Sequence, residues 1–266
     1  MSGLIVDQLI RTSEVRRTDN GLSVTRIGNV LHLILDAPQR RNALSRPMLA
    51  ALSSALHEMD ETVRGAVLSG RDIFSAGGDL RELTGTSSDI SYDDAVSEVA
   101  EAIRRAPRLV FAALEGPCIG AAADLALACD FRVAAEGSYI HIPAVRLGVL
   151  YNPEALARLQ DSLSPVAIRR LFLLGERLTG QEALGLGIVS HASKQGEAVS
   201  LAAALLEQIP VGGLEAAAAT KAFLNRSEKR GLLSHDWQER RRELLDSQVR
   251  GQAVAQAKQR FVREEG

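Results

Sequence analysis

Residues 109–135 read LVFAALEGPCIGAAADLALACDFRVAA, and the architecture that we predict starts from this stretch. Its first six residues are all apolar, which is typical of a strand buried on both faces. Gly116 and Pro117 break that strand, and residues 120–129 predict an alanine-rich helix packed tightly against its neighbours. A second strand follows over residues 131–135. Strand, helix and strand at this spacing favour an α/β fold with right-handed crossovers.

The N-terminal side continues this alternation. Gly28 and Asn29 predict a tight hairpin turn between two strands, because this dipeptide favours positive φ angles. Thr84 to Asp94 has no apolar period and is expected to be a mobile surface segment. The remaining elements expected before residue 109 are strands over 23–27, 30–36 and 65–69, helices over 46–60 and 95–105, and a glycine-rich loop over 70–78.

Beyond residue 150 the pattern becomes helical. Asn152 and Ser164 each precede a proline, and Thr179 with Glu182 forms a capping box, so each pair marks the start of a helix. Residues 198–263 are expected to be almost entirely helical. We therefore divide the chain into a core over 1–197 and a helical C-terminal region over 198–266.

Composition restricts the classes of function. The 266 residues carry 31 basic and 33 acidic side chains, which leaves no basic excess for nucleic acid or an anionic membrane. Asp124 interrupts the longest apolar candidate for a membrane span. Cys118 and Cys129 are expected to be buried, reduced thiols. These features favour a cytoplasmic protein that acts on a small molecule.

The usual signatures of metal, serine-nucleophile and phosphate-loop chemistry are absent from the sequence. We therefore expect no metal site. Two junctions rich in small residues remain, at 74–80 (FSAGGDL) and 116–124 (GPCIGAAAD). Small side chains let a ligand approach backbone amides, and the second junction opens a helix whose first amides are unpaired. The two junctions could form an anion hole, or they could simply permit close packing of helix and strand.

At these residues the sequence resembles the crotonase, or enoyl-CoA hydratase/isomerase, superfamily. The resemblance extends from about Val24 to Val189 and is specific because its segments occur in the family's order. Those segments are 38–45 (PQRRNALS), 74–80, 116–132, Ile142-Pro143 with Leu147-Gly148, and 178–189. It implies a crotonase-type spiral of ββα units around two sheets, with a helical C-terminal region that forms a trimer or a dimer of trimers.

The resemblance also implies a ligand, an acyl-CoA thioester, with coenzyme A entering as part of the substrate and no separate cofactor. The backbone amides that would bind the thioester oxygen correspond to Ala76 and Ala121. Such donors stabilise an enolate more than the neutral ground state. Alanine replaces the usual glycine at position 121, which leaves the N–H in place. Residues that match the walls of the family site are Arg40, Leu44, Gly77, Gly78, Asp79 and Gly120, and Lys258 matches a CoA-phosphate lysine loosely.

Hydration of a conjugated double bond needs two proton-transfer groups. The first glutamate of the family's hydratases corresponds to Asp124, and the second corresponds to Ala144, which cannot transfer a proton. Asp124 could act in catalysis, or it could stabilise the positive end of the helix dipole. For thioester hydrolysis, a third class of reaction that occurs in relatives, Asp79 could serve as a base, but a structural turn carboxylate is the simpler interpretation.

Residues 149–153 (VLYNP) resemble the methylmalonyl-CoA decarboxylase branch, in which a tyrosine at the position of Tyr151 contacts the reacting carboxylate. Tyr151 could have that role or could support the following helix. The sequence departs from that branch at Gly78, where the branch has histidine. We expect an enolate-forming acyl-CoA enzyme, with decarboxylation or isomerisation favoured over hydration. The alternatives are a hydratase that uses Asp124 alone and a non-catalytic acyl-CoA-binding scaffold.

Overall fold

The computed structural model describes residues 15–18, 20–84 and 87–225. By its internal contacts the chain forms two compact units, Met1–Glu207 and Gln208–Gly266. Both sheets lie in the first unit. The domain division after residue 197 remains a prediction, and Lys258 lies outside the described residues.

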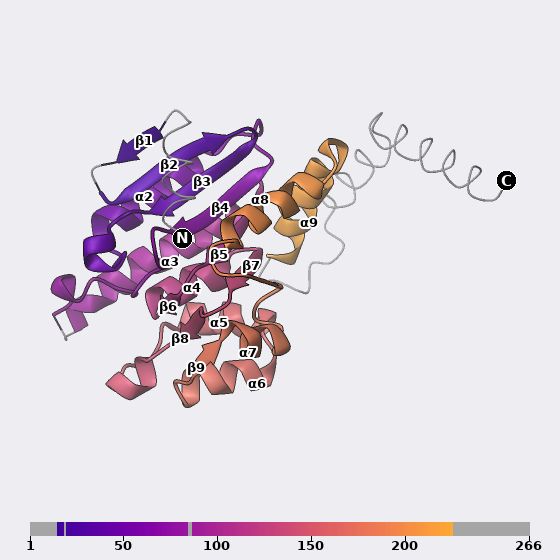
Figure 1. Ribbon diagram of the computed structural model, residues 1–266. Coiled ribbons are helices and arrows are strands. Elements are labelled where there is room, and N and C mark those ends of the chain that lie inside the picture. The colour runs from indigo at the N-terminus through magenta and orange to yellow at the C-terminus, as the bar shows by residue number, and fades with distance from the viewer. Residues whose placement is uncertain (1–14, 19, 85–86, 226–266) are drawn as a thin grey trace. The chain divides into compact units, whose positions relative to one another are not determined.

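The larger sheet of the first unit combines an antiparallel edge with a parallel body (Figure 1). β1, β2 and β3 pair antiparallel, whereas β4, β5, β7 and β10 extend the sheet in parallel. The predicted hairpin is confirmed, because Ile27 pairs with Val30 and Gly28 has φ +57°. In sheet order the strands are β1 (Val15–Thr18), β2 (Leu22–Ile27), β3 (Val30–Leu35), β4 (Gly65–Gly70), β5 (Leu109–Leu114), β7 (Phe131–Ala135) and β10 (His191–Ser193).

A second sheet contains three short strands, β6 (Pro117–Ile119), β8 (Tyr139–His141) and β9 (Arg177–Thr179). An α/β fold with two sheets is thus confirmed. The expectation of helices alone after residue 150 was wrong, because β9 and β10 lie there. Each has three residues, which is too short for the alternation that reveals a strand in sequence.

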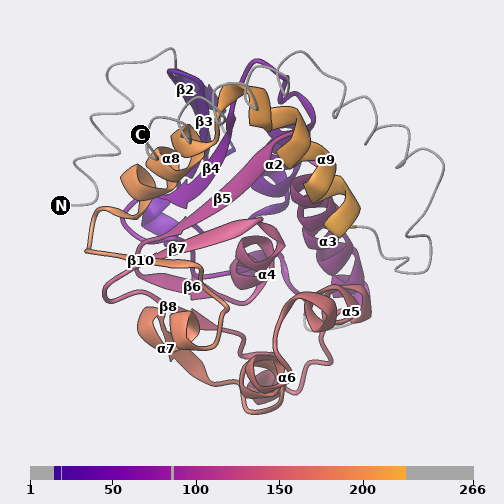
Figure 2. The ribbon, with the colours of Figure 1, turned by 90° about the vertical axis from the view of Figure 1, so that its right-hand side faces the viewer.

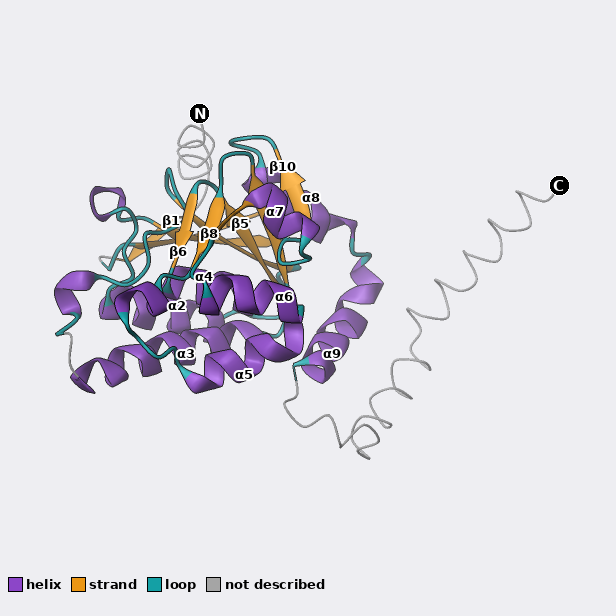
Figure 3. Ribbon diagram, turned by 90° about the horizontal axis from the view of Figure 1, so that it is seen from below, coloured by secondary structure: helices purple, strands orange, loops and turns teal. Residues whose placement is uncertain are grey.

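The helices of the first unit pack mainly against one side of the strands, where α2, α3, α4 and α5 gather (Figure 3). All three predicted start signals are confirmed. Asn152 and Ser164 accept hydrogen bonds from the first turns of α5 and α6, and Thr179 with Glu182 caps α7. The helices are α2 (Arg46–His57), α3 (Ile90–Arg105), α4 (Ala121–Ala128), α5 (Pro153–Ser162), α6 (Pro165–Ile168), α7 (Gly180–Gly185), α8 (Ala198–Gln208) and, in the second unit, α9 (Leu214–Leu224).

The start of α3 differs from the prediction. The helix begins at Ile90 rather than near residue 95, so part of the expected surface segment is helical. Tyr92 explains the difference, because its ring is 3% exposed and its hydroxyl donates to the Leu44 carbonyl at 2.5 Å. This long-range contact stabilises a first turn for which the local sequence gives no apolar period.

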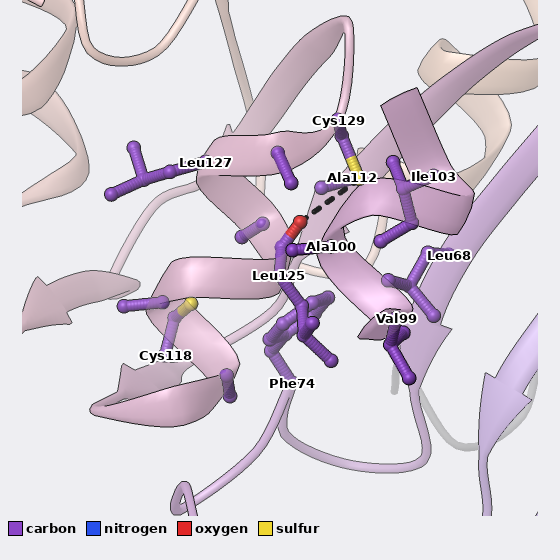
Figure 4. Packing of buried hydrophobic residues seen from close by; sticks show 14 of the residues in the cluster. Leu68, Phe74, Val99, Ala100, Ile103, Ala112, Cys118, Leu125, Leu127 and Cys129 are labelled. Atoms are coloured by element: carbon purple, nitrogen blue, oxygen red, sulfur yellow. Dashed lines mark hydrogen bonds between the residues drawn. The ribbon is translucent and has the colours of Figure 1, made fainter. Parts of the chain in front are cut away.

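Helix α4 lies among β6, α3 and the larger sheet (Figure 2), and its residues from Ala122 to Ala128 are all buried. Its alanines permit this close packing, while Leu125 and Phe74 fill the space around it (Figure 4). Cys118 and Cys129 are buried free thiols, as predicted.

Among the described residues, no single helix has the length and apolar character to cross a bilayer. The helices Ala198–Gln208 and Val211–Leu224 meet these criteria only when they are counted together.

Candidate active site

The two small-residue junctions lie side by side. The Ser75 amide donates to the Pro117 carbonyl at 3.0 Å, and the Ile119 amide donates to the Ser75 carbonyl at 3.2 Å. Gly77 follows with φ +96°, and a Cβ built on it would lie 2.6 Å from the Ile119 oxygen and 3.8 Å from the Ala121 nitrogen. Only glycine allows this approach, which brings the 75–77 segment next to the start of α4.

The amide of Ala121 is the first of α4, a position where a helix supplies no carbonyl to accept it. The preceding Gly120 has φ +56° and ψ −121°, a conformation suited to glycine, and its own amide donates to the His141 carbonyl at 2.8 Å. Ala121 itself has a right-handed helical backbone. The alanine therefore leaves the amide in place without backbone strain.

The Ala76 amide, by contrast, donates to the Arg41 carbonyl at 2.9 Å. Arg41 and Asn42 both have φ +53°, which is uncommon for residues other than glycine. The fully buried Asn42 side chain holds this conformation, because it accepts from the Ala37 amide at 2.9 Å and donates to the Arg71 and Ile73 carbonyls at 2.8 Å. Of the two amides expected to bind the thioester oxygen, the amide of Ala76 therefore already donates to a backbone carbonyl.

Leu44, Gly78 and Tyr92 form a packed layer behind this junction. The Leu44 amide donates to the Gly77 carbonyl at 2.8 Å. The Leu44 side chain is 0% exposed, so it holds Gly77 in position and does not present a surface to a ligand. The Tyr92 ring lies within 3.3 Å of the Cβ position of Gly78. This ring fills the space in which a larger side chain at position 78 would stand.

Asp79 is a structural carboxylate. It caps a short 3-10 helix by accepting from the Arg81 amide, and its side chain pairs with Arg81 at 2.6 Å and Arg40 at 3.4 Å. The hydrogen bond from Arg81 lowers the pKa of Asp79 to about 2. A carboxylate with so low a pKa is a weak proton acceptor at neutral pH, which agrees with the turn role. Arg40 therefore already forms an ion pair within the protein, with Asp79.

Asp124 lies one helical turn after Ala121, on the same face of α4. Its side chain is 3% exposed and forms an ion pair with Arg158 of α5, whose side chain is 10% exposed. Burial raises the pKa of Asp124 although the charge of Arg158 opposes this shift. A raised pKa makes the Asp124 carboxylate a stronger proton acceptor than an exposed aspartate.

Tyr151 completes this group. Its ring packs edge-on against Phe172 at a centroid distance of 4.9 Å, and burial raises the pKa of its phenol, with the charge of Asp124 as the next cause. Asp93 of α3 also acts electrostatically on Asp124 and Tyr151. Ala144 begins a 3-10 helix, Ala144–Leu147, and brings no titratable group to the second hydratase position.

Sequence reasoning missed Arg158, although a signal was present. Arg158 lies three residues after Ala155 and one before Leu159, and both of these are fully buried. It therefore belongs to the buried stripe of α5, where a charge needs a partner. Within the described ranges, no group of three or more His, Cys, Asp and Glu side chains is placed to bind a metal ion.

Comparisons with known proteins find related sequences and related structures. The sequence profile described as "Enoyl-CoA hydratase/isomerase" matches residues 25–263. The chain is 30% identical over 192 residues to the Mycobacterium tuberculosis protein echA6, named a probable enoyl-CoA hydratase, which covers 71% of this chain and 78% of that protein.

Solved structures show the same fold. An enoyl-CoA hydratase/carnithine racemase of Magnetospirillum magneticum superposes with a TM-score of 0.82 at 25% identity, covering 91% of this chain and 94% of that one. A Thermobifida fusca protein assigned to the enoyl-CoA hydratases, in complex with CoA, superposes with a TM-score of 0.70 at 26% identity, covering 88% and 95%.

Proposed function

Because this chain belongs to the enoyl-CoA hydratase/isomerase family of the crotonase superfamily, we propose that it binds an acyl-CoA thioester and stabilises the corresponding enolate. The observation that carries this proposal is the Ala121 amide at the start of α4, beside Gly77 and one turn from the buried carboxylate of Asp124. The CoA complex of the Thermobifida fusca relative supports CoA as the carrier.

The bond between the Ala76 amide and the Arg41 carbonyl suggests how this site favours the enolate. In the resting site the Ala76 amide already donates to the Arg41 carbonyl, so a neutral thioester oxygen would have to displace this acceptor. An enolate oxygen carries negative charge and accepts a hydrogen bond about twice as strong as a neutral acceptor does. The Ala76 amide therefore binds the substrate oxygen mainly when negative charge develops on it. Such an interaction is stronger in the transition state than in the ground state and lowers the barrier to enolate formation.

The carboxylate of Asp124 determines which classes of reaction we favour. Asp124 can remove a proton from one carbon and return it to another, as a double-bond isomerisation requires. A decarboxylation needs no base, only a proton for the α-carbon after CO2 has left. Hydration needs a second acid or base, and Ala144 cannot supply it. We therefore favour isomerisation or decarboxylation, in a cytoplasmic enzyme.

The experiment compares Ala121→Pro with Ala121→Gly. Proline removes the amide hydrogen at the first helical position, where its ring is tolerated, whereas glycine keeps the hydrogen. Each variant and the wild type are assayed on crotonyl-CoA, a 3-enoyl-CoA and methylmalonyl-CoA. We expect Ala121→Pro to lower kcat about 100- to 1000-fold on the accepted substrate, and Ala121→Gly to change it little.

Equal activity of the proline and glycine variants would contradict an amide donor at position 121. Rapid hydration of crotonyl-CoA that survives Asp124→Ala would contradict the assignment of Asp124. Tight binding of all three esters without turnover would support the alternative of a non-catalytic acyl-CoA scaffold.

A further inference from the structure

Arg158 has more hydrogen-bonding capacity than its surroundings use. A guanidinium carries five N–H donors. Among the described residues, Nη2 of Arg158 donates a hydrogen bond to Oδ1 of Asp124, whereas the buried Nε of Arg158 has no hydrogen-bond partner. Buried polar atoms are nearly always paired in folded proteins. A side chain that is only 10% exposed and still has an unused donor is therefore prepared for a further acceptor.

The position of Arg158 places this acceptor beside the proposed enolate site. Asp124, its partner, shares a face of α4 with Ala121 and lies one turn away. The Tyr151 phenol is close enough for the charges of both Asp124 and Arg158 to affect its pKa. An acyl group whose carbonyl lies at Ala121 would extend toward these side chains.

The nearby Asp93 does not exclude an anion from this position. Burial raises the pKa of Asp93, and the charges of Asp94 and Asp89 raise it further. These effects make Asp93 easier to protonate than an exposed aspartate, so it opposes an incoming anion less strongly. The positive charge that such an anion meets beside Asp124 is the guanidinium of Arg158.

We infer that Arg158 binds a carboxylate at the far end of the acyl group, so that the substrate is the CoA monothioester of a dicarboxylic acid. This inference rests on the proposed function and names its substrate class. Arginine recognises carboxylates through paired N–H bonds, and the unused Nε supplies a donor for that mode. The incoming carboxylate takes over part or all of the pairing that Asp124 has in the resting site.

The exchange also prepares Asp124 for proton transfer. When the substrate carboxylate pairs with Arg158, Asp124 stays buried and loses the charge that opposed its raised pKa. The pKa of Asp124 then rises further, so its carboxylate becomes a stronger base toward a C–H proton of the acyl group. Asp124 removes that proton to form the dienolate and returns it to another carbon, which leaves Asp124 ionised again and the double bond moved.

Pairing with Arg158 has opposite consequences for two kinds of acidic substrate. A carboxylate at the far end of the chain keeps its charge throughout the reaction, so Arg158 holds it equally in the ground and transition states. A malonyl-type carboxylate loses its charge as it leaves as CO2, so pairing would stabilise the ground state and slow the reaction. Arg158 therefore favours the far-end carboxylate, and with it isomerisation.

The test measures binding by calorimetry with matched esters. Malonyl-, succinyl- and glutaryl-CoA are each compared with a neutral isostere in which an isopropyl group replaces the terminal carboxylate. For the wild type we expect succinyl- or glutaryl-CoA to bind at least about tenfold more tightly than its isostere.

Two variants and one control make the test specific. Arg158→Met should abolish the preference for the acidic ester. Asp124→Asn should increase that preference, because the internal competitor for Arg158 is gone. Arg169→Met removes an exposed arginine whose side chain donates to the Pro165 carbonyl, and it should leave the preference unchanged.

Equal affinity of the wild type for acidic and neutral esters would overturn the inference and leave the ion pair as a structural link between α4 and α5. If Arg158→Met does not fold, the Asp124→Asn variant tests the inference in its place. An unchanged preference of Asp124→Asn for the acidic ester over the neutral ester would also overturn the inference. Failure to bind any CoA ester would instead overturn the proposed function.

Discussion

Gly78 is the residue at which the chain departs from the methylmalonyl-CoA decarboxylase branch, and the structure supplies a reason. Its Cβ position lies 3.1 Å from the Tyr92 hydroxyl, closer than an ordinary van der Waals contact. Tyr92 cannot easily move, since its hydroxyl is bonded to the Leu44 carbonyl and its ring is buried. Gly78 does not have a positive φ angle, so its backbone conformation is open to other residues. Lack of space alone therefore excludes a larger side chain.

This contact predicts a steric cost. Gly78→Ala should lower the free energy of unfolding by about 1 to 3 kcal/mol, because the added methyl group overpacks a rigid site. Urea unfolding gives the measurement. The matched control is Gly185→Ala, where no atom lies within 4 Å of the Cβ position, and it should change stability little or raise it slightly.

Tyr92→Leu provides a second background for the same measurement. With the ring removed, the cost of Gly78→Ala should shrink, because neighbouring substitutions are not additive. An equal cost in both backgrounds would show that Tyr92 is not the obstacle.

At the scale of the element, strand β3 carries a buried titratable group. His32 is 3% exposed, its neighbours in the sheet are Thr25 on β2 and Val67 on β4, and its Nδ1 has no hydrogen-bond partner in the described structure. Burial penalises the imidazolium and lowers the pKa of His32 from 6.5 to about 4. The folded chain therefore keeps this histidine neutral where the unfolded chain protonates it.

The sign of the pH dependence follows from this difference. Between pH 6.5 and 4, His32 is protonated more in the unfolded chain than in the folded chain. Its contribution to the free energy of unfolding therefore falls as the pH falls through this window. From pH 7 to 4.5 the contribution of His32 to this loss should be about 2 to 3 kcal/mol. Urea unfolding at both pH values should show a smaller loss for His32→Leu. A loss of the same size in both proteins would contradict the prediction.

At the scale of the whole molecule, the family resemblance leads us to propose a trimer or a dimer of trimers formed through the helical C-terminal region. In the second unit, Leu224 at the end of α9 is 73% exposed in the single chain, and Val211 is 72% exposed. Exposed leucine and valine side chains in such a region are consistent with a surface that another subunit covers.

Light scattering after gel filtration tests the assembly. We expect a mass three or six times the 28.5 kDa of one chain. Leu224→Asp should shift the mass toward the monomer, because an aspartate would be buried unpaired at the interface. Leu150→Asp, which alters a 91% exposed side chain of the first unit, is the control and should leave the mass unchanged. A monomeric wild type would contradict the proposed assembly.

The local sequence determined the α/β fold, the hairpin at Gly28 and the three helix caps, because these depend on apolar runs, turn residues and capping side chains close together in the chain. It also identified the junctions that contain Ala76 and Ala121, since small residues are visible directly. The tertiary structure alone decided the early start of α3, the commitment of the Ala76 amide to Arg41, and the pairing of Asp124 with Arg158. These features join residues that are far apart in sequence, and such contacts form only when folding brings the segments together and removes water from between them.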